Sequence, residues 1–301
     1  MKKIFLRNIT RFGVGGRANI FEVKKDERVP SLVRRLHARG EKMFVLGGGT
    51  NIIANDAGYT GPILAIRTKN IRIKKNSIRA DAGVLLETLV RTANRKGLAG
   101  LETLAGIPGT VGGALYGNAG AYGREIREVV QSVSVFDGKK MRTLSRRACA
   151  FGYRESIFKK RSWVIVSAVF FCKKENAENL IRTSKQIRAM RIKKYPRTLR
   201  CAGSIFKNIL VESSTGKKIL PNISHTKIIK GKIPAGVLLE GVGAKGMKKG
   251  NIRVAGHHAN LIVNTGGGKA KDVLYIIDTL KKRVRKKYGI TLEEEVQYLG
   301  F

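Results

Sequence analysis

The pattern of hydrophobic and polar positions divides the chain into short strands and amphipathic helices. Apolar residues spaced three and four apart mark one face of a helix, whereas strict alternation marks a half-buried strand. These rules predict helices over residues 26–40, 85–96, 176–191 and 272–288. They predict strands over 20–23, 43–46, 71–73, 77–82, 130–136, 163–171 and 291–299. This mixture favours an α+β class.

The last helical segment, Asp272 to Tyr288, shows the helical period clearly. Its apolar stripe consists of Val273, Ile276, Ile277, Leu280 and Val284. Basic residues fill positions 281–287 in part, where cations suit the carboxyl end of the helix dipole, and Gly289 ends the helix. Composition changes near Arg67 and near Pro196, so we expect domain boundaries there.

Charge is the most unusual property of the chain. Its 301 residues contain 60 Lys and Arg against 21 Asp and Glu, a formal net charge of +39. Nucleic-acid binders gather such charge on one surface, but here the basic residues are spread almost evenly. Two long stretches, Met43–Ile66 and Gly97–Gly123, contain none. The charge therefore does not favour specific nucleic-acid binding, and the two stretches without basic residues become candidate sites.

The remaining composition argues for a cytoplasmic protein without a metal centre. Cys149, Cys172 and Cys201 are odd in number and form no CxxC pair, which disfavours a disulfide framework or a zinc site. The adjacent histidines His257 and His258 lack an HExxH context. No run of about 20 apolar residues predicts a membrane span.

Each of the two stretches without basic residues contains a glycine-rich run. The first is Leu46-Gly-Gly-Gly-Thr-Asn-Ile-Ile53 after a predicted strand; the second is Gly106-Ile-Pro-Gly-Thr-Val-Gly-Gly113, continued by Asn118-Ala-Gly-Ala-Tyr-Gly123. Glycine lets backbone amides approach a ligand closely, so both runs together favour a bound dinucleotide, although either alone is compatible with tight turns. Neither is a GxGxxG Rossmann motif or a P-loop.

Five further motifs accompany these two runs. They are Thr10-Arg-Phe-Gly-Val-Gly-Gly16, Phe151-Gly-Tyr-Arg-Glu-Ser-Ile-Phe158, Ala202-Gly-Ser-Ile-Phe-Lys-Asn208, His258-Ala-Asn260 with Asn264, and Glu295-Val296. In this order, from about Asn8 to Gly300, the sequence resembles the UDP-N-acetylenolpyruvoylglucosamine reductase family of bacterial peptidoglycan precursor synthesis. It departs from the family pattern at Cys201-Ala202, where the family often has proline or serine, and at Ile209, where it usually has proline.

The resemblance implies a fold of the vanillyl-alcohol-oxidase/PCMH type, with two FAD-binding subdomains and a C-terminal α+β substrate domain. The expected division is 1–67 with 290–301 returning to it, then 68–195, then 196–289. The short connection between Phe158 and Ser204 resembles the shorter type of the family, which lacks an extra tyrosine-bearing loop.

The resemblance also implies FAD and NADPH as cofactors, with a nucleotide-sugar substrate. Residues matching the FAD-binding motifs are Gly47, Gly48, Gly49, Thr50, Asn51, Gly106, Ile107, Pro108, Gly109, Gly112, Gly113, Asn118, Gly120, Ala121 and Tyr122. Residues matching substrate contacts are Tyr153, Lys207 and Asn208, and Lys194 within the basic run 188–200 is the expected diphosphate contact.

Three residues match the catalytic positions of the family: Ser204 as proton donor, Arg154 facing the enolate of the substrate, and Glu295 beside it. A serine hydroxyl is a weak acid, so Ser204 needs a neighbour that favours its alkoxide, and Lys207 is an expected cation. Glu293 and Glu294 adjoin Glu295, but alternation on the predicted strand places Glu295 on the opposite face from Glu294.

Two other interpretations of the sequence remain. One is a different oxidoreductase on the same flavin fold, which shares the glycine loops but has no need for Ser204, Arg154 and Glu295 together. The other is a nucleic-acid or anionic-surface binder, supported by the net charge of +39 alone. We expect the first interpretation, a monomeric reductase with neither a specific nucleic-acid partner nor a membrane partner.

Overall fold

The structure, a computed structural model, describes residues 1–38, 40–196 and 198–301 and divides into two compact units. Unit 1 comprises Met1–Lys3, Ala18–Gly49 and Thr60–Lys193, and unit 2 comprises Ile4–Arg17, Thr50–Tyr59 and Lys194–Phe301. Arg39, within the predicted helix 26–40, and Arg197, within the basic run 188–200, lie outside the described residues.

Unit 1 contains most of the strands of the chain. Its helices are α1 (Val29–His37), α2 (Leu86–Arg95), α3 (Val111–Tyr116) and α4 (Ala177–Lys194). Its strands, some of which reach the unit boundary, are β1 (Lys2–Phe5), β2 (Arg17–Val23), β3 (Phe44–Leu46), β5 (Tyr59–Ile66), β6 (Ile71–Lys74), β7 (Ser77–Asp81), β8 (Leu98–Ala99), β9 (Gly120–Ala121), β10 (Arg124–Glu125), β11 (Val130–Phe136), β12 (Met141–Ser145), β13 (Val164–Phe171) and β14 (Lys173–Lys174).

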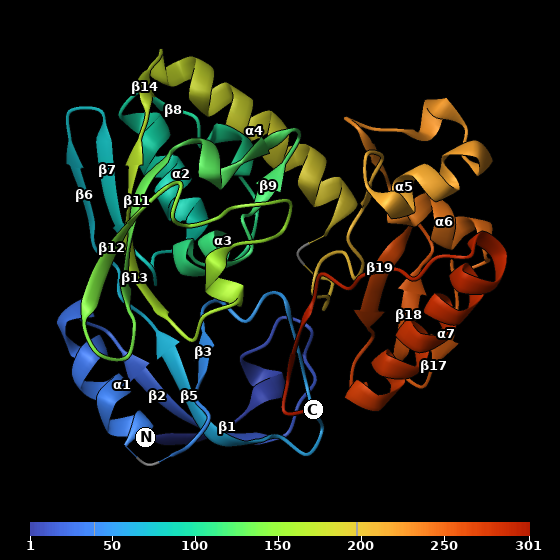
Figure 1. The fold of residues 1–301 in the computed structure, drawn as a ribbon, viewed down its shortest axis with the longest axis horizontal. Helices are drawn as coiled ribbons and strands as arrows, with labels where there is room; N and C mark the ends of the chain where they lie inside the picture. Colours follow the sequence, from blue (N-terminus) through green and yellow to red (C-terminus); the bar gives the residue numbers. More distant parts are fainter. Residues whose placement is uncertain (39, 197) are drawn as a thin grey trace. The chain divides into compact units, whose positions relative to one another are not determined.

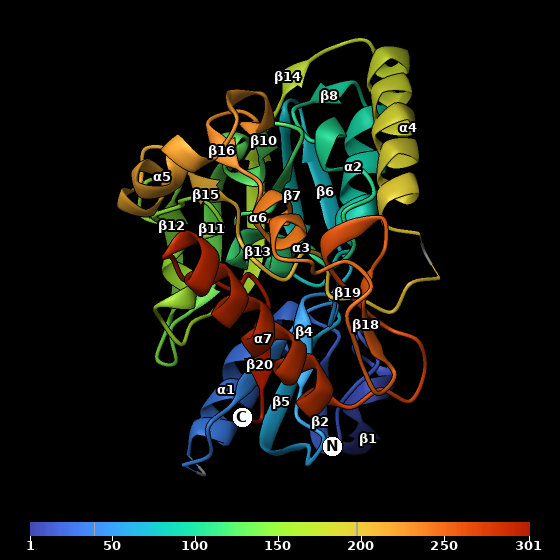
Figure 2. The ribbon, with the colours of Figure 1, turned by 90° about the vertical axis from the view of Figure 1, so that its right-hand side faces the viewer.

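A five-stranded antiparallel sheet, in the order β12-β11-β13-β7-β6, forms the frame of unit 1. β13 lies at its centre because the apolar run 164–171 is buried along almost its whole length. α2 and α3 lie beside this sheet (Figure 1), and α4 lies beside α2 (Figure 2). The buried Asn94 of α2 joins α4 by donating to Ser184 Oγ at 2.6 Å.

A four-stranded sheet, in the order β1-β2-β5-β3, carries the first glycine run. β3 pairs parallel to β5, with Leu46 opposite Ala65, and the chain leaves β3 directly into Gly47. The sequence pattern therefore predicted both the strand and the glycine turn at its carboxyl end.

Unit 2 has its own core, built from α7 and the strands beneath it. Its helices are α5 (Ser214–Ile219), α6 (Ala235–Gly241) and α7 (Ala270–Tyr288), and its strands are β4 (Ile52–Ala54), β15 (Ile209–Leu210), β16 (Lys232–Ile233), β17 (Lys248–Lys249), β18 (Ile252–Ala255), β19 (His258–Asn264) and β20 (Gln297–Leu299). The predicted apolar stripe of α7 is buried in full, and Gly289 ends the helix with φ +66°.

The predicted strand 291–299 is wrong in extent. Only Gln297–Leu299 form a strand, β20, which pairs parallel to β4. Upstream, the backbone makes single contacts instead of a ladder: Lys207 donates to the Glu293 carbonyl at 2.8 Å, and Glu295 donates to the Ile205 carbonyl at 2.7 Å. Alternation reports the direction of side chains in an extended segment, and such a segment does not need a full ladder of partners.

Among the helices that the structure describes, none has the length and apolar composition needed to cross a membrane.

Candidate functional site

The two glycine runs pack against each other within unit 1. A Cβ added at Gly48 would lie 2.8 Å from Gly109 Cα, and one added at Gly47 would lie 2.6 Å from Thr110 Oγ1. Real Cβ atoms do not approach backbone this closely, so Gly48 requires glycine, and a side chain at Gly47 would displace the Thr110 hydroxyl. Backbone from two distant parts of the sequence thus packs together without side chains between.

Basic residues adjoin these runs in space, although none occurs within them in sequence. Arg67 donates from Nη1 to the Gly47 carbonyl at 2.7 Å. At the second run, a Cβ added at Gly106 would lie 3.3 Å from Cδ of Arg191, and Glu87 accepts from the Gly106 amide at 2.8 Å while pairing with Arg188 at 2.6 Å. The tertiary structure thus brings positive charge to glycine runs that contain no basic residue themselves.

Asn118 ties the second glycine run to the Tyr-Arg motif. Its side chain is fully buried, and Nδ2 donates to the Gly152 carbonyl at 2.7 Å and to Glu125 Oε2 at 3.0 Å. Asn118 and Tyr122 both adopt left-handed backbone, with φ +42° and +53°. The loop between them pairs back on itself through Gly120 and Glu125. These contacts give Asn118 a role in shaping the predicted cofactor loop.

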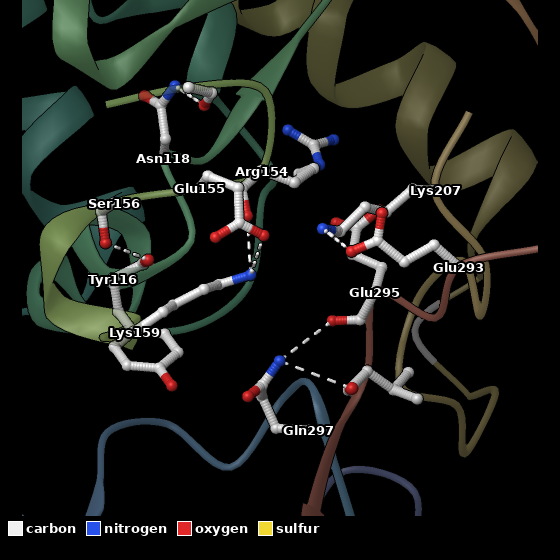
Figure 3. Close-up of polar contacts among 12 residues, drawn as sticks. Tyr116, Asn118, Arg154, Glu155, Ser156, Lys159, Lys207, Glu293, Glu295 and Gln297 are labelled. Carbon is white, nitrogen blue, oxygen red and sulfur yellow. Dashed lines mark hydrogen bonds and ion pairs between the residues drawn. The ribbon is translucent and has the colours of Figure 1, made fainter. Parts of the chain in front are cut away.

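Arg154 lies at the tip of a tight turn in unit 1 (Figure 3). Gly152 and Glu155 close the turn by exchanging two backbone hydrogen bonds, of 3.0 and 3.2 Å. Arg154 has φ +58°, a conformation that costs a non-glycine residue about 1 kcal/mol. Its Nη2 donates to the Gly120 carbonyl at 3.1 Å, and Tyr153 lies under the guanidinium at 5.5 Å. Unit 1 thus joins the predicted arginine to the predicted cofactor loop.

The residues that follow Arg154 stabilise the turn. Lys159 donates to the Arg154 carbonyl at 2.6 Å and pairs with Glu155 at 3.3 Å, and Ser156 donates to the Tyr116 carbonyl at 2.7 Å (Figure 3). Burial, together with the nearby Glu155 carboxylate, raises the pKa of the Tyr116 phenol above its ordinary value. A network of bonds within one short segment therefore maintains the strained backbone of Arg154.

Ser204 begins an extended segment of unit 2 that lies between β19 and residues 293–295. Ser204 bridges Leu261, and Ile205 donates to the Asn260 carbonyl at 3.1 Å. The buried Asn260 side chain then holds Phe206 by both backbone groups, accepting at 2.9 Å and donating at 2.8 Å. On the other edge, Glu295 donates to the Ile205 carbonyl. Unit 2 thus joins Ser204 and Glu295, which lie far apart in the sequence, through Ile205.

The three consecutive glutamates have different surroundings. Glu293 forms an ion pair with Lys207, and Glu294 forms one with Lys281 at 2.8 Å. The backbone carbonyl of Glu295 accepts from Asn51 Nδ2 at 3.0 Å and from Gln297 Nε2 at 3.4 Å. The side chains of the first two glutamates are thus each paired with a lysine of unit 2.

Three predicted site residues have structural contacts in unit 2. Lys207 is buried and pairs with Glu293. Asn208 Oδ1 accepts from the amide of Ala235, the first residue of α6, at 3.2 Å. The main chain of Asn51 meets β20 by accepting from the Gln297 amide at 2.9 Å. Motif matching had suggested ligand contacts at these positions, and the structure adds scaffold contacts.

Tyr195 was missed by the sequence analysis. Its hydroxyl lies 3.1 Å from Ser204 Oγ, within hydrogen-bonding distance. Nothing in the sequence distinguishes this tyrosine, which precedes Pro196 in a basic run. Only its distance from Ser204 in the folded chain identifies it.

The histidine pair supports the same region. His257 Nε2 lies 3.0 Å from the Lys194 carbonyl, and His258 Nδ1 accepts from the Asn260 amide at 3.2 Å. Within the described residues, no three His, Cys, Asp or Glu side chains gather as a metal site. The three cysteines are buried thiols, and burial raises the pKa of Cys149 and of Cys172 to about 11.

We expect His258 to make stability depend on pH. Burial, then the charges of Lys194 and His257, lower the pKa of His258 from 6.5 to about 4. Between these values the unfolded chain binds a proton that the folded chain does not, so the free energy of unfolding falls as pH falls. His258→Gln should flatten this fall by up to about 1.4 kcal/mol per pH unit. Urea unfolding of both proteins at intervals from pH 7 to 4 measures the free energy of unfolding. Equal slopes of this free energy against pH would contradict the role of His258.

A cavity of about 730 Å³ lies within unit 2, and none of its lining residues is a predicted site residue. Its charged lining consists of Arg7, Arg11, Asp56, Arg200, Lys269 and Lys271. Asp56 already accepts from the first amides of α7, at 2.9 and 3.2 Å. Because basic residues are spread along the chain, a basic lining does not distinguish the cavity as a ligand site.

Comparison with known proteins defines the class first. An FAD binding domain matches residues 18–141, which include both opposed glycine runs. The Cβ-excluding contact between Gly48 and Gly109 fits such a cofactor, because a dinucleotide needs close approach to backbone. The chain is therefore an FAD-dependent oxidoreductase with an α+β fold.

The particular family follows from the rest of the chain. The C-terminal domain of UDP-N-acetylenolpyruvoylglucosamine reductase matches residues 195–299. Reductases of this name from Solibacter usitatus and Carboxydothermus hydrogenoformans are 45% and 35% identical, each over 97% of this chain and over 94% and 91% of their own. The crystal structure of the Thermus caldophilus reductase has a TM-score of 0.77 at 29% identity, covering 99% of this chain and 98% of its own.

The chain belongs to the UDP-N-acetylenolpyruvoylglucosamine reductase family. The resemblance seen in the motifs is thereby confirmed, as are the α+β class and FAD as the cofactor.

Proposed function

We propose that this chain reduces the enolpyruvyl ether of UDP-N-acetylglucosamine-enolpyruvate to UDP-N-acetylmuramate, with NADPH as reductant, in peptidoglycan precursor synthesis. The observation that carries the proposal is 45% identity to a reductase of this name over 97% of the chain. FAD held by the glycine runs would supply the hydride chemistry that links NADPH to the terminal vinyl carbon of the substrate. The other steps belong to side chains of this protein.

The glycine runs are proposed to hold FAD. Residues 47–51, 106–113 and 118–122 supply backbone amides and carbonyls, and the contact between Gly48 and Gly109 keeps side chains out of that region. Arg67, fixed on the Gly47 carbonyl, adds a cation that suits an anionic cofactor. We propose a division of the chain into three domains: residues 1–67 together with 290–301, residues 68–195, and residues 196–289.

Ser204 is proposed to supply the proton. The carbon that does not receive the hydride is conjugated to the substrate carboxylate, so it carries enolate character and must be protonated. The Ser204 hydroxyl gives up its proton, the new C–H bond forms, and the electron pair of the O–H bond stays on Oγ. The segment 204–207 holds this oxygen in place because the buried Asn260 side chain clamps Phe206.

Arg154 and Glu295 are proposed to act on the enolate. The planar guanidinium of Arg154 can bind both oxygens of the carboxylate, onto which the enolate charge is delocalised, whereas a lysine offers no such fork. Its turn is fixed before substrate arrives, so little reorganisation is needed as charge develops. Glu295 polarises the same group or relays its proton. Tyr153, Lys207 and Asn208 line the substrate, and Lys194 contacts its diphosphate.

The wider setting follows from this chemistry. The partners are the nucleotide-sugar and NADPH, both anionic, and the net charge of +39 favours collecting such ligands at low salt. We propose a monomer in the cytoplasm with no specific nucleic-acid partner and no membrane partner.

The visible spectrum of the purified protein tests the proposal. We expect a yellow protein whose flavin absorbance is bleached by NADPH under anaerobic conditions and restored by the enolpyruvyl substrate. Bleaching without restoration would indicate a different oxidoreductase on this fold. A protein that remains colourless after incubation with FAD would contradict the proposal altogether.

A further inference from the structure

The Ser204 hydroxyl has a partner of its own within unit 2. Tyr195 OH lies 3.1 Å from Ser204 Oγ, and either oxygen can donate in the resting protein. Gly203, which precedes the serine, has φ +81°, so the chain turns sharply before it joins Leu261 of β19. The hydroxyl of Tyr195 therefore closes a loop whose two ends are both anchored.

The phenol ring is held from several sides. Tyr195 packs against a small apolar cluster formed by Cys201, Ala255, Leu261 and Val263. The ring of His258 lies 5.9 Å away, and the ammonium of Lys194 lies 5.5 Å from the centre of the Tyr195 ring. Next to it, His257 fixes the Lys194 carbonyl at 3.0 Å. The two adjacent histidines thus support the segment that carries Tyr195.

We propose that Tyr195 is a positioning residue for Ser204, and this rests on the proton-donor role proposed for that serine. When Ser204 has given its proton to the substrate carbon, Oγ holds the electron pair of the broken bond and can only accept. The Tyr195 hydroxyl must then be the donor, and a hydrogen bond to an anionic oxygen is stronger than one to a neutral hydroxyl. Tyr195 thereby favours the serine alkoxide and orients the hydroxyl before transfer, after which solvent returns the proton.

Removal of the tyrosine hydroxyl tests this role. Tyr195→Phe keeps the ring and its packing, so we expect the melting temperature and FAD content to be unchanged. In rapid mixing of the NADPH-reduced holoenzyme with the enolpyruvyl substrate, we expect flavin reoxidation to slow about ten- to a hundredfold. Flavin reduction by NADPH should stay within about twofold. The affinity of the oxidised holoenzyme for the substrate, measured by perturbation of the flavin spectrum, should also stay within about twofold.

A double mutant separates positioning from a general structural effect. In the Ser204→Ala background Tyr195→Phe should add nothing, because the oxygen that it supports is absent. An equal slowing in both backgrounds, or a loss of substrate affinity in Tyr195→Phe, would overturn the inference. Tyr275→Phe, at an exposed position on α7, is the matched control and should have no effect.

The two proposals can fail separately. If Ser204→Ala reoxidises at the wild-type rate, the proton-donor role of Ser204 is wrong and the role of Tyr195 with it. If Ser204→Ala is slow but Tyr195→Phe reoxidises normally, the donor role stands and only the inference on Tyr195 is overturned.

Discussion

Ser204→Ala is expected to retain reduction by NADPH and to lose turnover of the enol ether by about a thousandfold. General acid catalysis by a positioned side chain raises the rate roughly 10²- to 10⁴-fold, and alanine has no acidic proton to give at this position. Hydride transfer from NADPH needs no such acid, so the first half-reaction should stay within about twofold. Stopped-flow measurement of each half-reaction separately distinguishes the two.

Two further variants sharpen this prediction. Ser204→Cys restores an ionisable group with an ordinary pKa near about 8.5, so its flavin reoxidation should be faster than that of Ser204→Ala. Ser224→Ala removes an exposed serine of unit 2 and should behave as wild type. Equal slowing of both half-reactions by Ser204→Ala would instead indicate damage to cofactor binding and would contradict the assigned role.

Gly48→Ala is expected to produce a protein that binds FAD at least about tenfold more weakly. The added Cβ would lie 2.8 Å from Gly109 Cα and 3.4 Å from Gly109 C, both backbone atoms that cannot rotate away. Forcing apart such a contact costs about 1 to 3 kcal/mol and separates the two glycine runs that are proposed to hold the cofactor. FAD titration of the apoprotein, followed by fluorescence, measures the affinity, and a thermal melt measures the stability.

Gly117→Ala is the matched control for this substitution. Gly117 lies at the end of α3 with φ −96°, and an added Cβ would meet only the Gly113 carbonyl oxygen, at 3.7 Å. That is ordinary van der Waals contact, so stability and FAD affinity should change little. If Gly48→Ala binds FAD as tightly as Gly117→Ala, the close approach of the two runs is not what holds the cofactor.

The local pattern predicted elements well where one face of the element is buried. Residues 130–136 form β11 as expected, and the stripe from Val273 to Val284 is the buried face of α7. In these segments the spacing of apolar residues equals the spacing of buried positions, so the sequence alone predicts the element. The prediction of a strand over residues 291–296 was wrong because the backbone there makes single hydrogen bonds to residues 205–207 instead of a ladder.

The site was predictable to the extent that its chemistry lies in motifs. The glycine runs and the resemblance predicted the family and FAD as its cofactor, and the comparisons confirmed both. The roles of Ser204, Arg154 and Glu295 stay predictions. Motifs do not report neighbours from elsewhere in the chain, so the contact of Tyr195 with Ser204 and the ion pair of Lys207 with Glu293 were both missed.

By itself the sequence determined the class of the protein, the family and the residue types available for chemistry, because these depend on local order along the chain. Only the tertiary structure decided which groups meet: Gly48 against Gly109, Arg67 on Gly47, and Tyr195 on Ser204. Such contacts form when the burial of apolar surface brings distant segments together, and a polar pair a few ångströms apart leaves no periodic trace in either segment.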